Sequence, residues 1–376
     1  MLFYCGFDTF LQFKQKGGKN NVFLQPLSDL ILDQNDKVIN AFIGWCSLFL
    51  QTGKGQVLYL GYSKCKNPNE TGTIIDKNDL VVCSQVPKYI VNIECGAKET
   101  FLITIDLDLY KWTGFNFSKT FPTQISLNPD CQNSRDESEE KGSSAINNHV
   151  EASQFKVEQL CVGVEYSCLL TDDGRAYLFD ITNGLLTTLL TNHKIISIGA
   201  GQEHILLLTE DGKVLSYGRG SRGQLGHNNL DNVLDTPAVT IEALDGIKCR
   251  SIAAGGWHSL ALSETGDVYA WGWNESGQLG LSKDKVTMKA TPIPLEISED
   301  DSFMMISAGS RHSMAVSENG ILFGWGWNKW GQLGLDPKTI VCCDSPQVIP
   351  VDEKVTNICC KFWSSLIETE RDNNNV

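Results

Sequence analysis

The sequence contains no apolar run of about 18 residues or more, so we expect no membrane-spanning helix and no membrane partner. No basic stretch precedes the apolar residues of Met1–Phe13, and we expect no signal peptide. None of its 13 cysteines form a C-x-x-C motif, so we expect no metal and no cofactor. Most cysteines lie in apolar, strand-like segments, which favours free thiols in a reducing compartment. Positive charge is scarce as well: the formal net charge is −14, which disfavours direct sequence-specific binding to nucleic acid.

What the sequence has in abundance is a segment rich in glycine and tryptophan, and this segment recurs. It reads "GWHSLALSETGDVYAWGWNESGQLGL" from Gly256, "GQEHILLLTEDGKVLSYGRGSRGQLGH" from Gly201 and "GSRHSMAVSENGILFGWGWNKWGQLGL" from Gly309. Corresponding turn glycines and Gly-Gln-Leu-Gly endings are spaced by 54 residues. A constant period of this size with strand-like content indicates a solenoid, propeller or array.

Weaker copies raise the number of repeats to seven, with first halves that start near residues 44, 96, 163, 201, 255, 309 and 360. The last copy stops at Thr369, and the N-terminal segment Phe3–Phe10 has the character of its missing second half. Complementary halves at the two ends lock a ring, whereas an open solenoid needs a cap at each end. We therefore predict an all-β, seven-bladed β-propeller over residues 1–370, closed by N- and C-terminal strands in one shared blade.

Glycine and tryptophan have different predicted roles in each unit. Glycine allows tight turns and close backbone approaches, while Trp271 and Trp273 are expected to point to opposite faces of a blade and fill the gaps beside it. The predicted structural residues of the repeats are Gly212, Gly223, Gly226, Gly266, Trp271, Gly272, Gly277, Gly280, Gly320, Gly326, Gly331 and Gly334.

Two segments break the repeat pattern. Residues 117–154 are polar and acidic at their centre, and we interpret them as a flexible insertion, with partner binding or modification as the alternative. Residues 371–376 are interpreted in the same way, as a disordered tail.

No catalytic set stands out, and we expect the protein not to be an enzyme. His258 and Ser259 are neighbours on a predicted strand and so face opposite sides, which prevents a nucleophile–base pair. The "GRGSRGQLG" segment lacks the Lys-Ser/Thr step of a phosphate-binding loop. Three recurring histidines could converge on a metal, but the other four repeats have no histidine at that position.

The G-x-x-H-S segment, the acidic hairpin turn and the G-W-G-x-N-x-x-G-Q-L-G ending together resemble the repeats of the regulator of chromosome condensation family, most strongly over Gly199–Leu335. The chain is most similar to a small, single-domain member of that family. This resemblance implies a non-catalytic adaptor in the nucleus, associated with chromosomes and also present in the cytoplasm. It implies a Jumonji-type chromatin oxygenase as partner, contact with histones or the nucleosome through that partner, and a role in histone methylation and chromosome segregation.

Other members of the family suggest different functions. The founding member is a guanine nucleotide exchange factor for a small nuclear GTPase, and this remains the alternative. The sequence has neither a basic N-terminal tail nor a wedge-like hairpin, which disfavours exchange. A related ultraviolet photoreceptor uses repeated Gly-Trp-Arg-His-Thr segments, which this chain splits between Trp257 and Arg311. A ubiquitin ligase module would need a fused ligase domain.

In this family the rim of the central channel is where partners bind, and the start of each innermost strand is expected there. Tryptophan and arginine are the residue types that most often anchor interfaces. The predicted contact residues are Glu203, His204, Trp257, His258, Arg311, His312 and Trp363. The alternative is that the histidines and serines only tie one blade to the next by hydrogen bonds. Trp330 is a further candidate, either exposed or folded back on its own blade.

Overall fold

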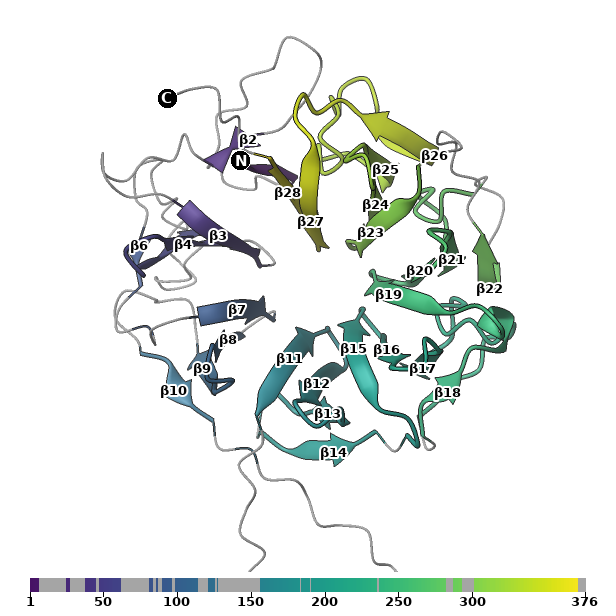
Figure 1. Cartoon of the computed structure of the whole chain (residues 1–376), viewed down its shortest axis with the longest axis horizontal. Coiled ribbons are helices and arrows are strands. Elements are labelled where there is room, and N and C mark those ends of the chain that lie inside the picture. Colours follow the sequence, from purple (N-terminus) through teal and green to yellow (C-terminus); the bar gives the residue numbers. More distant parts are fainter. Residues whose placement is uncertain are drawn as a thin grey trace, which may run out of the picture.

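Each repeat of the sequence forms one four-stranded antiparallel sheet, and the computed structural model arranges seven such blades in a ring (Figure 1). The structure describes residues 1–6, 25–27, 38–44, 47–61, 81–83, 86, 90–96, 99–113, 121–125, 127, 156–182, 184–189, 191–234, 237–281, 287–292 and 301–370. The prediction of an all-β, seven-bladed propeller is confirmed.

The strands of the first four blades run from the axis outward in chain order. Blade 1 comprises β3 (Val38–Ile43), β4 (Ser47–Thr52), β5 (Val57–Gly61) and β6 (Val81–Val82). Blade 2 comprises β7 (Ile90–Cys95), β8 (Glu99–Thr104), β9 (Leu109–Thr113) and β10 (Thr123–Gln124). Blade 3 comprises β11 (Val157–Val162), β12 (Ser167–Thr171), β13 (Ala176–Phe179) and β14 (Leu186–Thr188). Blade 4 comprises β15 (Ile195–Ala200), β16 (His204–Thr209), β17 (Val214–Gly218) and β18 (Val239–Thr240), followed by the short 3-10 helix η2 (Glu242–Leu244).

Blades 5 and 6 repeat this order, and blade 7 completes the ring with both ends of the described chain. Blade 5 comprises β19 (Cys249–Ala254), β20 (His258–Ser263), β21 (Val268–Gly272) and β22 (Thr287–Pro292). Blade 6 comprises β23 (Phe303–Ala308), β24 (His312–Ser317), β25 (Leu322–Trp327) and β26 (Cys342–Ile349). Blade 7 comprises β27 (Val355–Lys361), β28 (Ser364–Thr369), β1 (Leu2–Gly6) and β2 (Gln25–Pro26).

The ring is closed in blade 7 by pairing between the two ends of the described chain. Strand β1 pairs with β28 from Leu2 opposite Glu368 to Gly6 opposite Ser364. The pairing continues through Met1, whose carbonyl oxygen accepts a hydrogen bond from the Thr369 amide at 2.8 Å. These bonds pair the backbone N–H and C=O groups of β28 that would otherwise lie unpaired at a sheet edge. The predicted shared blade is confirmed.

The second strand of each blade lies in the middle of the packing. All six residues of β16, β20 and β24 are buried, because another blade packs on each of their faces. Trp271 has no exposed surface and packs with residues of blade 4, including Leu206 and Leu208. Its indole Nε1 donates a hydrogen bond to the Gln224 carbonyl oxygen at 2.9 Å. Trp271 therefore fills the gap between blades 4 and 5, as predicted, whereas Trp273 lies beyond the end of β21.

Every glycine predicted as structural has a positive φ angle. Gly272 shows why the repeat requires this residue, since its φ is +105° and a Cβ there would lie 2.6 Å from the Trp257 carbonyl oxygen. The close backbone approach predicted at Gly272 is confirmed.

Replacing Gly272 with alanine is expected to lower the free energy of unfolding by about 3 kcal/mol, because left-handed backbone strain adds to a clash with fixed backbone atoms. Gly55 provides the matched control, since its φ is +78° but a Cβ would have no atom within 4 Å. Gly55→Ala should cost only the backbone strain, about 1 kcal/mol. Chemical denaturation of both variants measures the difference, and equal losses would contradict the steric argument.

The structure corrects one placement within the repeat. The G-x-x-H segment does not start the innermost strand: His204, His258 and His312 each begin the second strand of a blade. The innermost strand precedes it, as in β15 before β16, and the segment forms the loop between them.

The predicted insertion over residues 117–154 and the tail over residues 371–376 lie almost wholly outside the described residues. Within the insertion, Thr123 and Gln124 form β10 and pair with Lys111 and Tyr110 of β9. No helix among the described residues is long and apolar enough to cross a bilayer. The ten described cysteines are all free and seven are buried, in agreement with the expectation of free thiols.

Candidate interaction surface

The three recurring histidines form identical hydrogen-bond chains between neighbouring blades. His204, His258 and His312 place Nε2 2.9 Å from the hydroxyls of Ser259, Ser313 and Ser365 in the next blade. Each serine in turn donates to a glutamine carbonyl oxygen, at 2.8 to 2.9 Å. Since a serine hydroxyl has one proton, it must accept from the histidine, so each neutral ring carries its proton on Nε2.

Burial fixes the charge of these histidines. Each has no exposed surface, and desolvation lowers the pKa of each imidazole to about 3. A partner therefore cannot contact their side chains. This burial does not support the prediction that His204, His258 and His312 bind a partner. The histidine–serine hydrogen bonds from blade to blade, given as the alternative, are present in the structure.

The residues that directly precede these positions have a different environment. Glu203, Trp257, Arg311 and Trp363 occupy equivalent loops of blades 4 to 7, each just before the second strand, and each is partly exposed. The structure thus brings these four predicted contact residues to the same face of the ring.

On this face arginines and tryptophans alternate across blades. The Arg222 guanidinium carbon lies 4.1 Å from the ring centroid of Trp257 and 4.8 Å from that of Trp273. The Arg311 guanidinium carbon lies 4.5 Å from the Trp273 centroid and 5.6 Å from the Trp327 centroid. These distances are within the range of cation–π attraction.

Edge-to-face contacts between indoles complete the arrangement. The Trp257 and Trp273 centroids are 5.4 Å apart, and the Trp327 and Trp363 centroids are 5.1 Å apart. We call this set the arginine–indole row. Its members are Arg222, Trp257, Trp273, Arg311, Trp327 and Trp363.

Sequence reasoning missed three members of the row, Arg222, Trp273 and Trp327. The signal for two of them was present, because Trp273 and Trp327 are 54 residues apart and each follows a repeat glycine. Arg222 belongs to a loop of blade 4, and only the packing of blade 4 against blade 5 brings its guanidinium over the Trp257 and Trp273 rings.

The two arginines of the row have no carboxylate partner among the described residues. In addition, Arg311 Nε and Trp257 Nε1 are buried donors without an acceptor in that part of the chain. Arg219 on the same face is different, since its Nη2 lies 2.7 Å from Glu165 Oε1 and its Nε also donates to that carboxylate. The row therefore presents positive charge that the described protein does not neutralise.

Trp330, the remaining predicted contact, is not part of the row. Its side chain is 37% exposed, with Lys329 Nζ 5.3 Å from the ring centroid. Of the two options for this residue, the exposed one holds in the structure.

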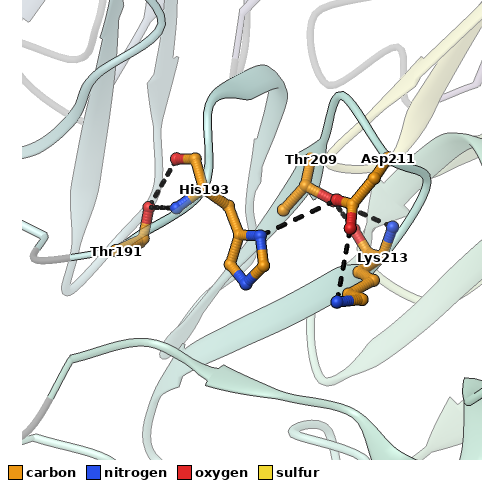
Figure 2. Close-up of polar contacts among 5 residues, drawn as sticks. All are labelled: Thr191, His193, Thr209, Asp211 and Lys213. Carbon is orange, nitrogen blue, oxygen red and sulfur yellow. Dashed lines mark hydrogen bonds and ion pairs between the residues drawn. The ribbon is translucent and has the colours of Figure 1, made fainter.

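A second polar cluster lies at the hairpin turn between β16 and β17 (Figure 2). Asp211 accepts a hydrogen bond from the Thr209 hydroxyl at 2.5 Å and lies 3.3 Å from Lys213 Nζ and 3.8 Å from His193 Nδ1. The Thr209 hydroxyl holds the pKa of the Asp211 carboxyl below its ordinary value. Thr171 makes the equivalent bond to Asp173 in blade 3, at 2.6 Å, so the cluster is a turn motif of the repeat rather than a catalytic site.

A pocket of about 530 Å³ lies beside blade 4, with His227, Asp231 and Glu242 in its lining. His227 Nε2 is 2.9 Å from the Ser216 hydroxyl, and burial lowers the pKa of its imidazole. Among the described residues, no three side chains of His, Cys, Asp or Glu come together as metal ligands.

Models of the regulator of chromosome condensation (RCC1) repeat match residues 211–262, 265–316 and 319–360, and a second model of this repeat matches 195–224 and 249–278. The mouse RCC1 domain-containing protein 1 is 35% identical over 217 residues, which are 48% of this chain and 57% of that protein. The guanine nucleotide exchange factor SRM1 of Saccharomyces cerevisiae is 35% identical over 152 residues, 37% of this chain and 32% of that one. The matched region thus spans little more than half the length of the mouse relative.

The fold is similar over the whole chain to the crystal structure of Prp20p from Saccharomyces cerevisiae, described with its binding to Gsp1p and histones. The TM-score is 0.71 at 19% identity, and the match covers 99% of this chain and 92% of Prp20p. The strongest repeats of the sequence, the positive-φ glycines and the ring of seven blades agree with these matches. The chain therefore carries repeats of the regulator of chromosome condensation family within a seven-bladed propeller of that family's type.

Proposed function

We propose that this protein is a non-catalytic interaction adaptor that binds its partner through the arginine–indole row. Its partner is a Jumonji-type chromatin oxygenase, and histones or the nucleosome are reached through that partner. The protein acts in the nucleus on chromosomes, in histone methylation and chromosome segregation, and is also present in the cytoplasm.

The observation that carries the adaptor function is the composition and rigidity of the row. Partly exposed tryptophan and arginine are the side chains that contribute most to protein interfaces. The rings of the row come from three adjacent blades, and the residues that directly follow Trp257 and Arg311 make fully buried histidine–serine bonds to the next blade. A surface that is ordered before binding loses little conformational entropy when a partner docks. The resemblance of the repeats to the regulator of chromosome condensation family is what favours the oxygenase as that partner.

The test is affinity purification from nuclear extract with the intact chain and with Trp257→Ala/Arg311→Ala. We expect the intact chain to retain a Jumonji-type oxygenase and the double variant to retain at least about tenfold less, because two anchor residues are lost. Arg175→Ala is the control, since Arg175 lies in the turn between β12 and β13, outside the row. Equal retention by the double variant and the intact chain would remove the row from the binding surface, and no oxygenase in any sample would overturn the partner.

The second candidate function is nucleotide exchange on a small nuclear GTPase. It is favoured by the similarity to the exchange factor SRM1 and by the fold shared with Prp20p. Fluorescent guanine nucleotide release from a nuclear GTPase distinguishes the two functions. The adaptor function predicts the same release rate with and without this protein, whereas strong acceleration together with no captured oxygenase would establish the second candidate.

A further inference from the structure

We propose that the arginine–indole row recognises carboxylates, and that the partner segment it binds is an extended acidic peptide with two acidic residues separated by one residue. This inference rests on the proposed adaptor function and adds the chemistry of the contact.

The first argument is the balance of donors and acceptors. Arginine and tryptophan side chains carry N–H donors and no acceptors, so the whole row is donor-only. The described chain supplies no carboxylate to Arg222 or Arg311, whereas Arg219 on the same face has Glu165. A ligand that complements this surface must bring acceptors, and negative charge on them.

The second argument is the orientation of the guanidinium groups. Indole rings approach Arg222 and Arg311 as cation–π partners, and such stacking leaves the in-plane N–H groups at the edge of the guanidinium for hydrogen bonds. A carboxylate matches that edge with two parallel bonds, which are stronger than bonds to neutral acceptors. Arg219 already demonstrates this pairing on the same face, because its Nε donates to Glu165 Oε2 at 2.9 Å and its Nη2 donates to Glu165 Oε1 at 2.7 Å.

The third argument is spacing. Arg222 and Arg311 both contact Trp273, at 4.8 and 4.5 Å from its centroid, so one indole separates the two charges. In an extended peptide, side chains on the same side recur every second residue, at roughly 7 Å. The two guanidinium carbons, at 4.8 and 4.5 Å from one centroid, are at most 9.3 Å apart, so two acidic side chains on the same side of an extended peptide can reach both. The rings of the row offer apolar contact to the rest of the segment.

The charge of the protein makes the proposal sharply testable. With a formal net charge of −14, the chain repels acidic peptides in general. Saturable binding of an acidic peptide therefore reports a local cationic site and not non-specific attraction.

The experiment uses the full chain and a fluorescent peptide of alternating glutamate and serine, with a glutamine–serine peptide of equal length for comparison. We expect saturable anisotropy with the glutamate peptide and at least about tenfold weaker binding of the glutamine peptide. Arg222→Gln and Arg311→Gln should each weaken the glutamate peptide about tenfold, and Arg175→Gln should leave it unchanged. Arg311→Lys keeps the charge but loses the planar edge, and should bind between wild type and Arg311→Gln.

Equal binding of the two peptides, or binding unaffected by both arginine variants in a chain with unchanged near-ultraviolet circular dichroism, would overturn the inference. If the oxygenase is captured but the glutamate peptide does not bind, this inference fails and the adaptor function stands. If the peptide binds at the row but no oxygenase is captured, the chemistry stands and the proposed partner fails. Tighter peptide binding after neutralisation of Asp136, Glu137, Glu139 and Glu140 would make the chain's own acidic segment the occupant and would overturn assignment to a partner.

Discussion

Trp271→Ala and Trp325→Ala are each expected to lower the free energy of unfolding by about 3–5 kcal/mol. Both indoles have no exposed surface, and they fill the space between adjacent blades where no smaller neighbour can move in. Their Nε1 atoms also donate to the carbonyl oxygens of Gln224 and Gln278 at 2.9 Å, so truncation leaves two buried acceptors with fewer donors. Loss of one of these indoles therefore loosens the packing of both blades between which it lies.

Chemical denaturation followed by far-ultraviolet circular dichroism measures this loss without depending on tryptophan emission. Trp330→Ala is the control, because that ring is 37% exposed, and it should change stability by no more than about 0.5 kcal/mol. Trp271→Phe separates packing from hydrogen bonding, since it keeps an aromatic ring and should cost about 1–2 kcal/mol. If Trp271→Ala lowered the free energy of unfolding no more than Trp330→Ala, packing of the Trp271 indole between blades would not stabilise the ring.

The number of blades and the closure of the ring could be predicted from sequence because each blade needs the same physical parts. A turn with positive φ at Gly212, Gly266 and Gly320 recurs with a fixed spacing, and complementary half-units at the two ends have one simple solution. The order of strands within a blade was harder to predict. The innermost strands have no sequence marker as strong as G-x-x-H. The G-x-x-H segment was therefore assigned to the start of the innermost strand, whereas its histidine begins the second strand.

The candidate surface was only partly predictable, because neighbouring residues have opposite environments. Trp257 is a partly exposed ring in the row, whereas His258, the next residue, is fully buried and bonded to the following blade. Alternation along a strand predicts opposite faces, but it does not say which face is covered. Arg222 could not be predicted at all, since its place beside Trp257 depends on how blades 4 and 5 pack.

Lowering the pH from 7 to 4 is expected to reduce the free energy of unfolding by about 3 kcal/mol for each of His204, His258 and His312. Desolvation lowers the pKa of each imidazole from 6.5 to about 3 in the folded state. A lowered pKa means that protonation favours the unfolded chain. The stabilising contribution is therefore complete above pH 6.5, decreases as the pH falls, and is lost near pH 3.

The three contributions together approach the whole stability of an ordinary domain, about 5–15 kcal/mol, so the propeller should unfold in mild acid. Carboxylates such as Asp211, whose pKa is held below its ordinary value, lose their contribution only at lower pH, which leaves the window between pH 6.5 and about 4.5 to the histidines. The measurement is the urea midpoint as a function of pH.

The variant that isolates the cause is His204→Asn/His258→Asn/His312→Asn. Asparagine keeps a donor for the serine hydroxyl but does not titrate, so this variant should be less stable at pH 7. Between pH 6.5 and 4.5 it should keep only the acid sensitivity that comes from His227, whose imidazole pKa burial also lowers. His193→Asn is the control, because His193 is partly exposed at a turn, and it should keep the acid sensitivity of the wild type. Unchanged acid sensitivity in the triple variant would mean that these histidines are already charged or hydrated at neutral pH. The serine–histidine chains would then not be uncharged, water-excluding hydrogen bonds between the blades that carry the arginine–indole row.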